Sequence, residues 1–174
     1  MPSHDHQIVV ALVIRDLRPS DSADIVDYYC PFYDETKEDP SFGISLHHEK
    51  PSLSNGLNWF SGLYKKMADG DAIAMVADMD SHVVGPCEAS RLQPSSDLSH
   101  RGDLGISVSK DHRGKGVGTA LMQETLQRGR GRFEMIEIIV LTTNQAAKRL
   151  YEKFGFKAFG VRPRSVKKGD GYFA

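Results

Sequence analysis

A glycine-rich turn lies between a strand pattern and a helix pattern in the middle of the chain, and it limits the possible folds to a few. Residues 103–109, DLGISVS, alternate polar and apolar side chains, as a half-buried strand does. The following residues, KDHRGKGVG, hold three glycines at alternate positions, and residues 121–128 then place apolar side chains at helical spacing. Residues 136–141, IEIIVL, indicate a buried strand. Strand, helix and strand in this order predict a right-handed crossover between two parallel strands of one sheet.

Weaker patterns on either side supply the remaining strands and helices. Before the turn they predict a strand within residues 8–18, a helix cap at Ser20 or Asp21 followed by a helix through Tyr29, and a helix at 58–67. A hairpin of strands at 72–77 and 83–92 follows, with Pro86 interrupting or bulging the second strand. After the turn they predict a helix from 144 to 154, a strand at 156–161 and a short last strand at 171–174. Residues 31–55, rich in proline, aspartate, serine and histidine, predict a long irregular loop. The expected fold class is therefore α/β, with a mixed sheet flanked by helices.

Length and composition favour one domain over residues 1–174. Of these 174 residues 40% are hydrophobic, enough for one sizeable core, and residues 1–10 are expected to form a flexible tail. The net charge of -1 gives no overall attraction to nucleic acid or to an anionic membrane surface. Two cysteines, Cys30 and Cys87, argue against a disulfide framework or a thiolate zinc site. We therefore expect a cytoplasmic protein without a metal, a membrane partner or a nucleic-acid partner, and leave open whether it forms a homodimer.

The glycine-rich turn has the composition of an anion-binding site. The first N–H groups of a helix have no partner within the helix, and the helix dipole places partial positive charge there. Gly114, Gly116 and Gly118 leave room for a phosphate to approach these N–H groups, while Arg113 and Lys115 add full charges. The Walker pattern and the dinucleotide pattern GxGxxG are both absent, so the turn predicts another phosphate-bearing ligand.

Three motifs in order resemble the GNAT superfamily of acyl-CoA-dependent N-acetyltransferases. RGKGVG, residues 113–118, is similar to the R/QxxGxG/A signature, in which this turn holds the diphosphate of coenzyme A. LGISV, residues 104–108, resembles the fourth strand of the family, and NQAAKRLYEKFGF, residues 144–156, resembles its last conserved motif. The strong resemblance covers about residues 103–161, the expected coenzyme-binding core. It implies the GNAT acyl-CoA N-acyltransferase fold, whose mixed sheet splays between its fourth and fifth strands.

The resemblance also implies which residues contact acetyl-CoA, the expected co-substrate. Main-chain groups of Ile106, Ser107 and Val108 would pair with the pantetheine arm, and the diphosphate would bind to the turn residues Arg113, Gly114, Lys115, Gly116, Val117, Gly118 and Thr119. Asn144 would contact the coenzyme from the start of a helix, cap that helix, or do both. Tyr151 would face the coenzyme sulfur as general acid, with an ordinary core tyrosine as the alternative.

The general base is less clearly indicated than the coenzyme site. Glu88 and Asp103 are carboxylates near the expected cleft, and His100 has a suitable ordinary pKa, but each could equally be a solvated side chain, and a chain of water molecules could do the same work. Cys87 could form an acyl-enzyme intermediate, although direct transfer is the norm in the family the chain resembles.

The expected function is an N-acetyltransferase that moves the acetyl group of acetyl-CoA directly to a primary amine of a small molecule or peptide. A non-catalytic acyl-CoA-binding or regulatory module is the alternative. The acceptor site is expected among residues 28–59 and 86–101, where aromatic and acidic side chains would suit a cationic amine or form an ordinary solvated loop: Tyr29, Phe32, Tyr33, Asp34, Glu35, Glu38, Asp39 and Phe42.

Overall fold

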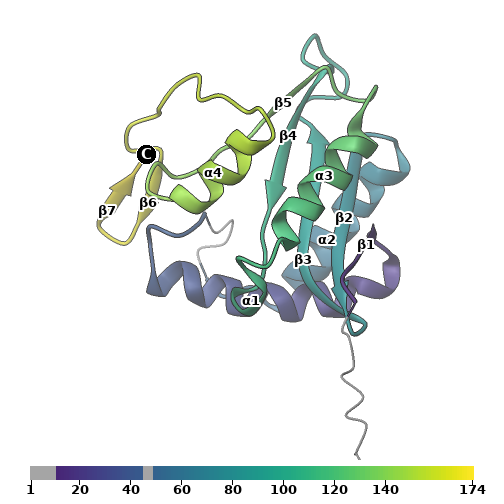
Figure 1. The fold of residues 1–174 in the computed structure, drawn as a ribbon, viewed down its shortest axis with the longest axis horizontal. Helices are drawn as coiled ribbons and strands as arrows, with labels where there is room; N and C mark the ends of the chain where they lie inside the picture. The colour runs from purple at the N-terminus through teal and green to yellow at the C-terminus, as the bar shows by residue number, and fades with distance from the viewer. Residues whose placement is uncertain (1–10, 45–48) are drawn as a thin grey trace, which may run out of the picture.

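The computed structural model describes residues 11–44 and 49–174, so the expected tail at 1–10 lies outside the described residues. Strands β1 to β5 form one sheet in the order of the chain, and β6 and β7 form a separate hairpin. Helix α3 covers one face of the sheet and helices α1 and α2 cover the other (Figure 1). The elements are β1 (Val13–Asp16), α1 (Ser22–Glu38), α2 (Leu53–Ala68), β2 (Ala72–Met79), β3 (His82–Arg91), β4 (Arg101–Ile106), α3 (Val117–Gly129), β5 (Met135–Glu137), α4 (Gln145–Lys153), β6 (Val166–Lys168) and β7 (Gly171–Phe173), with short 3-10 turns at Pro19–Asp21 and Lys110–His112. The predicted mixed α/β class is confirmed.

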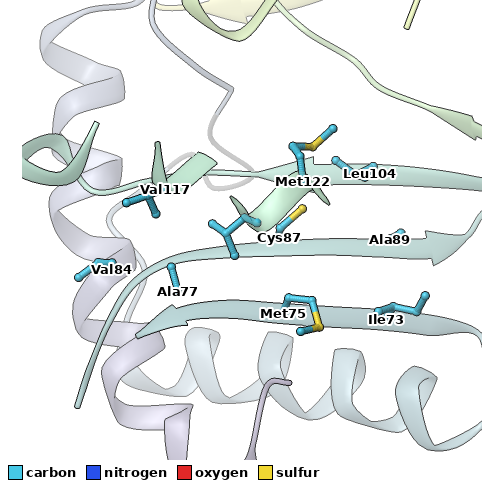
Figure 2. Packing of buried hydrophobic residues seen from close by; sticks show 10 residues of the cluster. Ile73, Met75, Ala77, Val84, Cys87, Ala89, Leu104, Val117 and Met122 are labelled. Atoms are coloured by element: carbon cyan, nitrogen blue, oxygen red, sulfur yellow. The ribbon is translucent and has the colours of Figure 1, made fainter. Parts of the chain in front are cut away.

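Strand β2 lies at the centre of two hydrophobic cores. Its odd-numbered residues Ile73, Met75 and Ala77 pack with Leu121 and Met122 of α3. Figure 2 shows this cluster, in which side chains of β2, β3 and β4 meet those of α3. The even-numbered residues of β2 face the other way and pack with α1 and α2, among them Ile25, Phe60 and Leu63. Because successive side chains of β2 point to opposite faces of the sheet, this one strand packs against helices on both faces.

The predicted crossover is confirmed, and the two strands that it joins separate early. Strands β4 and β5 run parallel and are paired from Arg101 with Met135 to Asp103 with Glu137. Beyond Asp103, β4 continues along β3 without a β5 partner, whereas the pairing of β3 with β4 reaches Ile106. The edge of β4 that faces β5 is therefore unpaired after Asp103.

The predicted loop at 31–55 is wrong at both ends, because helices occupy much of it. Helix α1 continues through Pro31 to Glu38, and α2 begins at Leu53 instead of 58. Proline inside a helix removes one hydrogen bond. Packing outweighs that cost here, since Tyr28, Tyr33 and Thr36 are buried on both sides of Pro31.

Three strand predictions also differ from the structure. Strand β5 ends at Glu137 instead of 141, and residues 156–161 form no strand. Once β4 and β5 diverge, these segments have no neighbour to pair with, and Phe159 is 80% exposed. Strand β3 runs through Pro86, and its register shift lies just before it, where Ala77 faces Gly85 and Asp78 faces Val83.

Within residues 11–44 and 49–174, no helix has both the length and the apolar content that crossing a membrane requires.

Candidate active site

A cleft of about 1130 Å³ lies where β4 and β5 separate. Its walls come from both sides of the gap and include nearly every residue of the predicted coenzyme site. Helices α1 and α2 and the segment after α1 form one wall, the strands form the floor, and the glycine-rich turn and α4 form the other wall. Its lining includes Tyr29, Phe32, Phe42, Trp59, Glu88, Asp103, Gly105, Ile106, Ser107, Val108, Arg113, Gly114, Gly116, Gly118, Thr119, Asn144 and Tyr151. Lys115 and Val117 are the predicted coenzyme residues that do not line it.

The unpaired edge of β4 presents main-chain groups of alternate residues to the cleft. The N–H groups of Ser107 and Ser109 donate to Pro86 O at 3.1 Å and Val84 O at 2.8 Å, so both point toward β3. Because successive residues of a strand direct their main-chain groups to opposite neighbours, the N–H groups of Ile106 and Val108 point toward the gap. The N–H of Ser107, one of the residues predicted to contact the coenzyme, is thus already bonded to β3.

Gly85 explains why the end of β4 lies so close to β3. A Cβ at Gly85 would lie 2.6 Å from the main-chain oxygen of Ser107, a distance that real side chains do not adopt. The missing side chain therefore allows the chain after β4 to lie against β3 next to the cleft.

The three glycines of the turn have different physical reasons to be glycine. Gly114 and Gly116 have φ of +71° and +88°, in the left-handed region that other residues rarely adopt. Gly116 is the N-cap of α3, and no side chain caps this helix. Gly118 lies inside α3, where a Cβ would be 3.4 Å from the side chain of Leu150 on α4. Two glycines therefore shape the turn, and the third lies where α3 packs against Leu150 of α4.

The start of α3 fits a diphosphate. A Cβ at Gly114 or Gly116 would meet no protein atom within 4 Å, so both glycines border open space. Val117 has its side chain in the core at 3% exposure, which leaves its main-chain N–H as its contribution to a ligand. Lys115 is exposed and Thr119 is half-buried. Unpartnered N–H groups, open space and a nearby lysine are the features that phosphate binding requires.

Arg113 differs from its prediction, because its side chain is engaged within the protein. Its guanidinium forms a two-pronged ion pair with Glu35 of α1, in which Nη2 lies 2.7 Å from Oε2. Its Nε donates to the main-chain oxygen of Val108 at 2.7 Å, and its charge lies 4.1 Å from the centre of the Phe42 ring. Glu35, one of the four acidic residues that the sequence suggested for a cationic amine, is therefore neutralised by Arg113.

Asn144 and Tyr151 lie on the α4 wall of the cleft. Asn144 caps α4, since its Oδ1 accepts from the N–H of Ala147 at 3.0 Å, and its Nδ2 donates to the main-chain oxygen of Phe42. Tyr151 packs edge-on against Phe156, with ring centres 6.2 Å apart. Burial, with a smaller effect of Cys87, raises the pKa of Tyr151 to about 12, so its hydroxyl keeps its proton at neutral pH.

Glu88 is the most unusual titratable group in the cleft. Its Oε2 is buried and has no hydrogen-bond partner among the described residues. Burial, and then the negative charge of Asp103, raises the pKa of Glu88 to about 7. Desolvation disfavours the charged form of a carboxyl group and a neighbouring like charge adds to this. Glu88 can therefore both hold and release a proton near neutral pH.

The other candidate base and nucleophile residues lie in less suitable surroundings. Asp103 lines the cleft with an exposed side chain on β4. His100 is exposed in the loop before β4, where its Nδ1 lies 3.0 Å from Asp97 O. Cys87 is fully buried, and burial raises the pKa of its thiol to about 12, so it lacks the thiolate that a covalent route needs.

An aromatic wall runs along the α1 and α2 side of the cleft. Its four rings form a continuous chain, with centres 6.1 Å apart between Trp59 and Tyr29, 5.7 Å between Tyr29 and Phe32, and 5.9 Å between Phe32 and Phe42. Trp59 also packs against the core that contains Leu63, so it joins this core to the cleft.

Metal chemistry has no obvious donor set in the part of the chain that is described. Residues 11–44 and 49–174 contain no group of three or more histidine, cysteine, aspartate or glutamate side chains placed to hold a metal ion.

Residues 24–156 match the sequence profile of the acetyltransferase (GNAT) family. An L-amino acid N-acetyltransferase from Escherichia coli is 33% identical over 100 residues, which cover 56% of this chain and 61% of the E. coli protein. An L-methionine sulfoximine/L-methionine sulfone acetyltransferase from Pseudomonas paraeruginosa is 25% identical over 122 residues, 69% of each chain. The match to the E. coli protein thus spans less than two thirds of its length.

Solved structures share the fold. An acetyltransferase of this kind from Streptococcus pneumoniae superimposes with a TM-score of 0.79 at 23% identity, covering 94% of both chains. An acetyltransferase from Salmonella typhimurium, solved with acetyl-CoA, superimposes with a TM-score of 0.77 at 18% identity and covers 94% of this chain and 89% of its own.

Proposed function

Because the chain belongs to the acetyltransferase (GNAT) family, we propose that it is an N-acetyltransferase that moves the acetyl group of acetyl-CoA directly to the primary amine of an amino-acid-like small molecule. The observation that carries this proposal is one cleft that holds both a proton acceptor and a proton donor. Glu88, whose carboxyl group has a pKa of about 7, and Tyr151, whose hydroxyl has a pKa of about 12, line the same cleft as the open glycine-rich turn.

In this proposal the turn and β4 hold the donor. The N–H groups at the start of α3 bind the diphosphate, with the charge of Lys115 nearby. The pantetheine amides pair with the free edge of β4 at Ile106 and Val108, as an added strand would. One of these N–H groups also polarises the thioester carbonyl.

Glu88 and Tyr151 handle the protons. Amine attack on the thioester requires a neutral amine, and Glu88 in its ionised form accepts the proton that the amine loses. The C–S bond then breaks, and Tyr151 donates its hydroxyl proton to the departing sulfur. Because the acetyl group passes directly between the two substrates, no acyl-enzyme forms, in keeping with the buried thiol of Cys87.

The aromatic wall supports an acceptor with an apolar body. Half-buried rings of Tyr29, Phe32, Phe42 and Trp59 offer apolar surface and negative ring faces, which attract an ammonium group and pack against apolar atoms. The named substrates of the E. coli and Pseudomonas relatives are amino acids or methionine derivatives. We therefore assign the acceptor to amino-acid-like amines with an apolar side chain.

A panel of amines tests the proposal. The purified chain is mixed with acetyl-CoA and matched amines, and released thiol is followed; methionine, phenylalanine and their amides should be acetylated faster than aspartate or glutamate. Acetyl-CoA binding without turnover above hydrolysis on any amine would overturn the catalytic assignment and favour a non-catalytic acyl-CoA-binding module.

A further inference from the structure

Arg113 connects the glycine-rich turn to three parts of the molecule that lie far apart in the sequence. Its side chain donates a hydrogen bond to Val108, just after β4, and forms an ion pair with Glu35 of α1. It also lies over the ring of Phe42. Glu35 follows Phe32 by one helical turn, so the ion pair forms at the end of α1 that carries the aromatic wall. One side chain of the donor site is thus bonded to the wall of the acceptor site.

The ion pair is well shielded from water. The side chains of Glu35 and Arg113 are 17% and 28% exposed. A more exposed pair lies at the end of α2, where the side chains of Asp69 and Lys65 are 51% and 78% exposed. Exposed pairs contribute little, whereas removal of one partner from a shielded pair leaves an uncompensated charge. The pair of Asp69 with Lys65 is therefore a natural control.

Phe42 is held from several sides. Its ring lies between Arg113 and Phe32, and its main-chain oxygen accepts from Asn144. The residues next to it are tied to the same side of the cleft, since Thr143 Oγ1 donates to Ser41 O at 3.0 Å and Lys168 Nζ donates to Pro40 O at 2.7 Å. These bonds bring residues 40–43 across from α1 to the start of α4 and to β6.

We propose that Glu35 is a positioning residue for the acceptor site, which acts through Arg113 to hold Phe42 and the end of α1 at a fixed distance from the glycine-rich turn. The inference depends on the proposed function for its catalytic readout. Glu35 touches neither substrate in this arrangement. Its loss loosens the aromatic wall and misplaces the amine, while the N–H groups that bind the diphosphate stay in place.

Steady-state kinetics of single and double variants test the coupling. Glu35→Gln should lower kcat/KM for the amine by about tenfold, as expected when a reacting group is poorly placed. Acetyl-CoA affinity, measured by direct titration, should change less than threefold. Arg113→Gln should have a similar effect on the amine, and the double variant should be no worse than either single one, because both remove the same interaction. Asp69→Asn is the matched control and should behave like the unaltered protein.

Arg113→Lys separates the positioning role from charge alone. Lysine keeps the positive charge near the diphosphate but lacks the planar fork that reaches Glu35 and Val108 together. We expect this variant to lose as much amine kcat/KM as Arg113→Gln. The proposal would be overturned if Arg113→Lys kept the activity of the unaltered protein. It would also be overturned if the loss in the double variant equalled the product of the two single losses.

The single tryptophan of the chain, Trp59, gives a readout that needs no turnover. It lies in the aromatic wall, so an amine that binds there should alter its fluorescence. In Glu35→Gln the titration midpoint should move to about tenfold higher amine concentration. If no turnover is seen at all, the proposed function fails but this titration still decides the role of Glu35; an unchanged midpoint in Glu35→Gln would refute it.

Discussion

The carboxylate of Glu88 lies over Gly105, its direct partner on the neighbouring strand. A Cβ on Gly105 would be 3.8 Å from Oε1 and from Cγ of Glu88. Gly105 is on the part of β4 that has no β5 partner, next to the N–H of Ile106 that points into the gap. Glu88 is therefore positioned beside the place where the thioester would pair with β4, which a base for the attacking amine requires.

Glu88→Gln should remove the rising limb of the pH–rate profile. Since Glu88 has a pKa of about 7 and works as a base only when ionised, kcat/KM of the unaltered protein should rise through pH 7. The amide cannot accept a proton, so activity should fall roughly 100-fold or more at pH 8. Rates from pH 5.5 to 9 measure both effects, with Glu124→Gln on α3 as control. A Glu88→Gln enzyme with full activity and an unchanged profile would exclude Glu88 as the base.

The same substitution should change how stability depends on pH. Burial raises the pKa of Glu88 from its ordinary 4.5 to about 7, so between these values the folded chain keeps a proton that the unfolded chain releases. This group therefore lowers the free energy of unfolding as pH rises from 4.5 to 7. Relative to the unaltered protein, Glu88→Gln should gain about 3 kcal/mol between pH 4.5 and pH 8. Urea unfolding at both pH values measures this; a constant difference would contradict it.

Tyr151→Phe should slow the chemical step and leave coenzyme binding intact. The phenylalanine keeps the ring that packs on Phe156 but has no proton for the sulfur. We expect kcat to fall about 10- to 100-fold, with little change in the Kd of acetyl-CoA. Tyr64→Phe, on the outer face of α2, is the control and should behave like the unaltered protein. Equal activity of the two variants would make Tyr151 an ordinary core residue.

Gly116→Ala should weaken acetyl-CoA binding beyond its effect on stability. At φ of +88°, alanine costs about 1 kcal/mol in backbone strain, and its methyl group would enter the space left for the diphosphate. Gly70, between α2 and β2, has φ of +80° and also has no atom within 4 Å of a Cβ. Gly70→Ala therefore introduces the same backbone strain at a position away from the proposed diphosphate site.

Thermal unfolding and isothermal titration of both glycine variants separate the two effects. Both should lose similar stability, while Gly116→Ala alone should lose about tenfold or more in affinity. Equal affinities in the two variants would remove the turn from the coenzyme site.

The part of the fold that the sequence predicts best is where periodicity is long and the chain pairs with its neighbours. The apolar run at 72–77, the alternation at 103–106 and the helical stripe at 121–128 predict β2, β4 and α3, because each buries apolar side chains. Pro31 led to the wrong prediction of a loop, because the buried side chains of Tyr28 and Tyr33 stabilise the helix on both sides of the proline. The strand expected at 156–161 fails because strand formation needs a partner, and the divergence of β4 from β5 is a property of the whole sheet.

The site is predicted unevenly for a similar reason. Gly114 and Gly116 are evident in the sequence because their backbone geometry restricts them to glycine. The roles of Glu88 and Arg113 depend on contacts between residues that lie far apart in the chain. No local pattern shows that Glu88 is desolvated beside Asp103, or that Arg113 pairs with Glu35, 78 positions away.

The short pairing of β5 makes the C-terminal part of the chain a local reporter of ligand binding. Strand β5 pairs with β4 at only three residues, Met135–Glu137, whereas β2 pairs with β3 at all eight of its residues, Ala72–Met79. Amide hydrogens in β5 should therefore exchange with deuterated water through a local opening well below the free energy of global unfolding. A ligand that bridges the free edge of β4 and the start of α4 would close that opening, so slower exchange at 135–137 would measure occupancy of the cleft without any chemistry taking place.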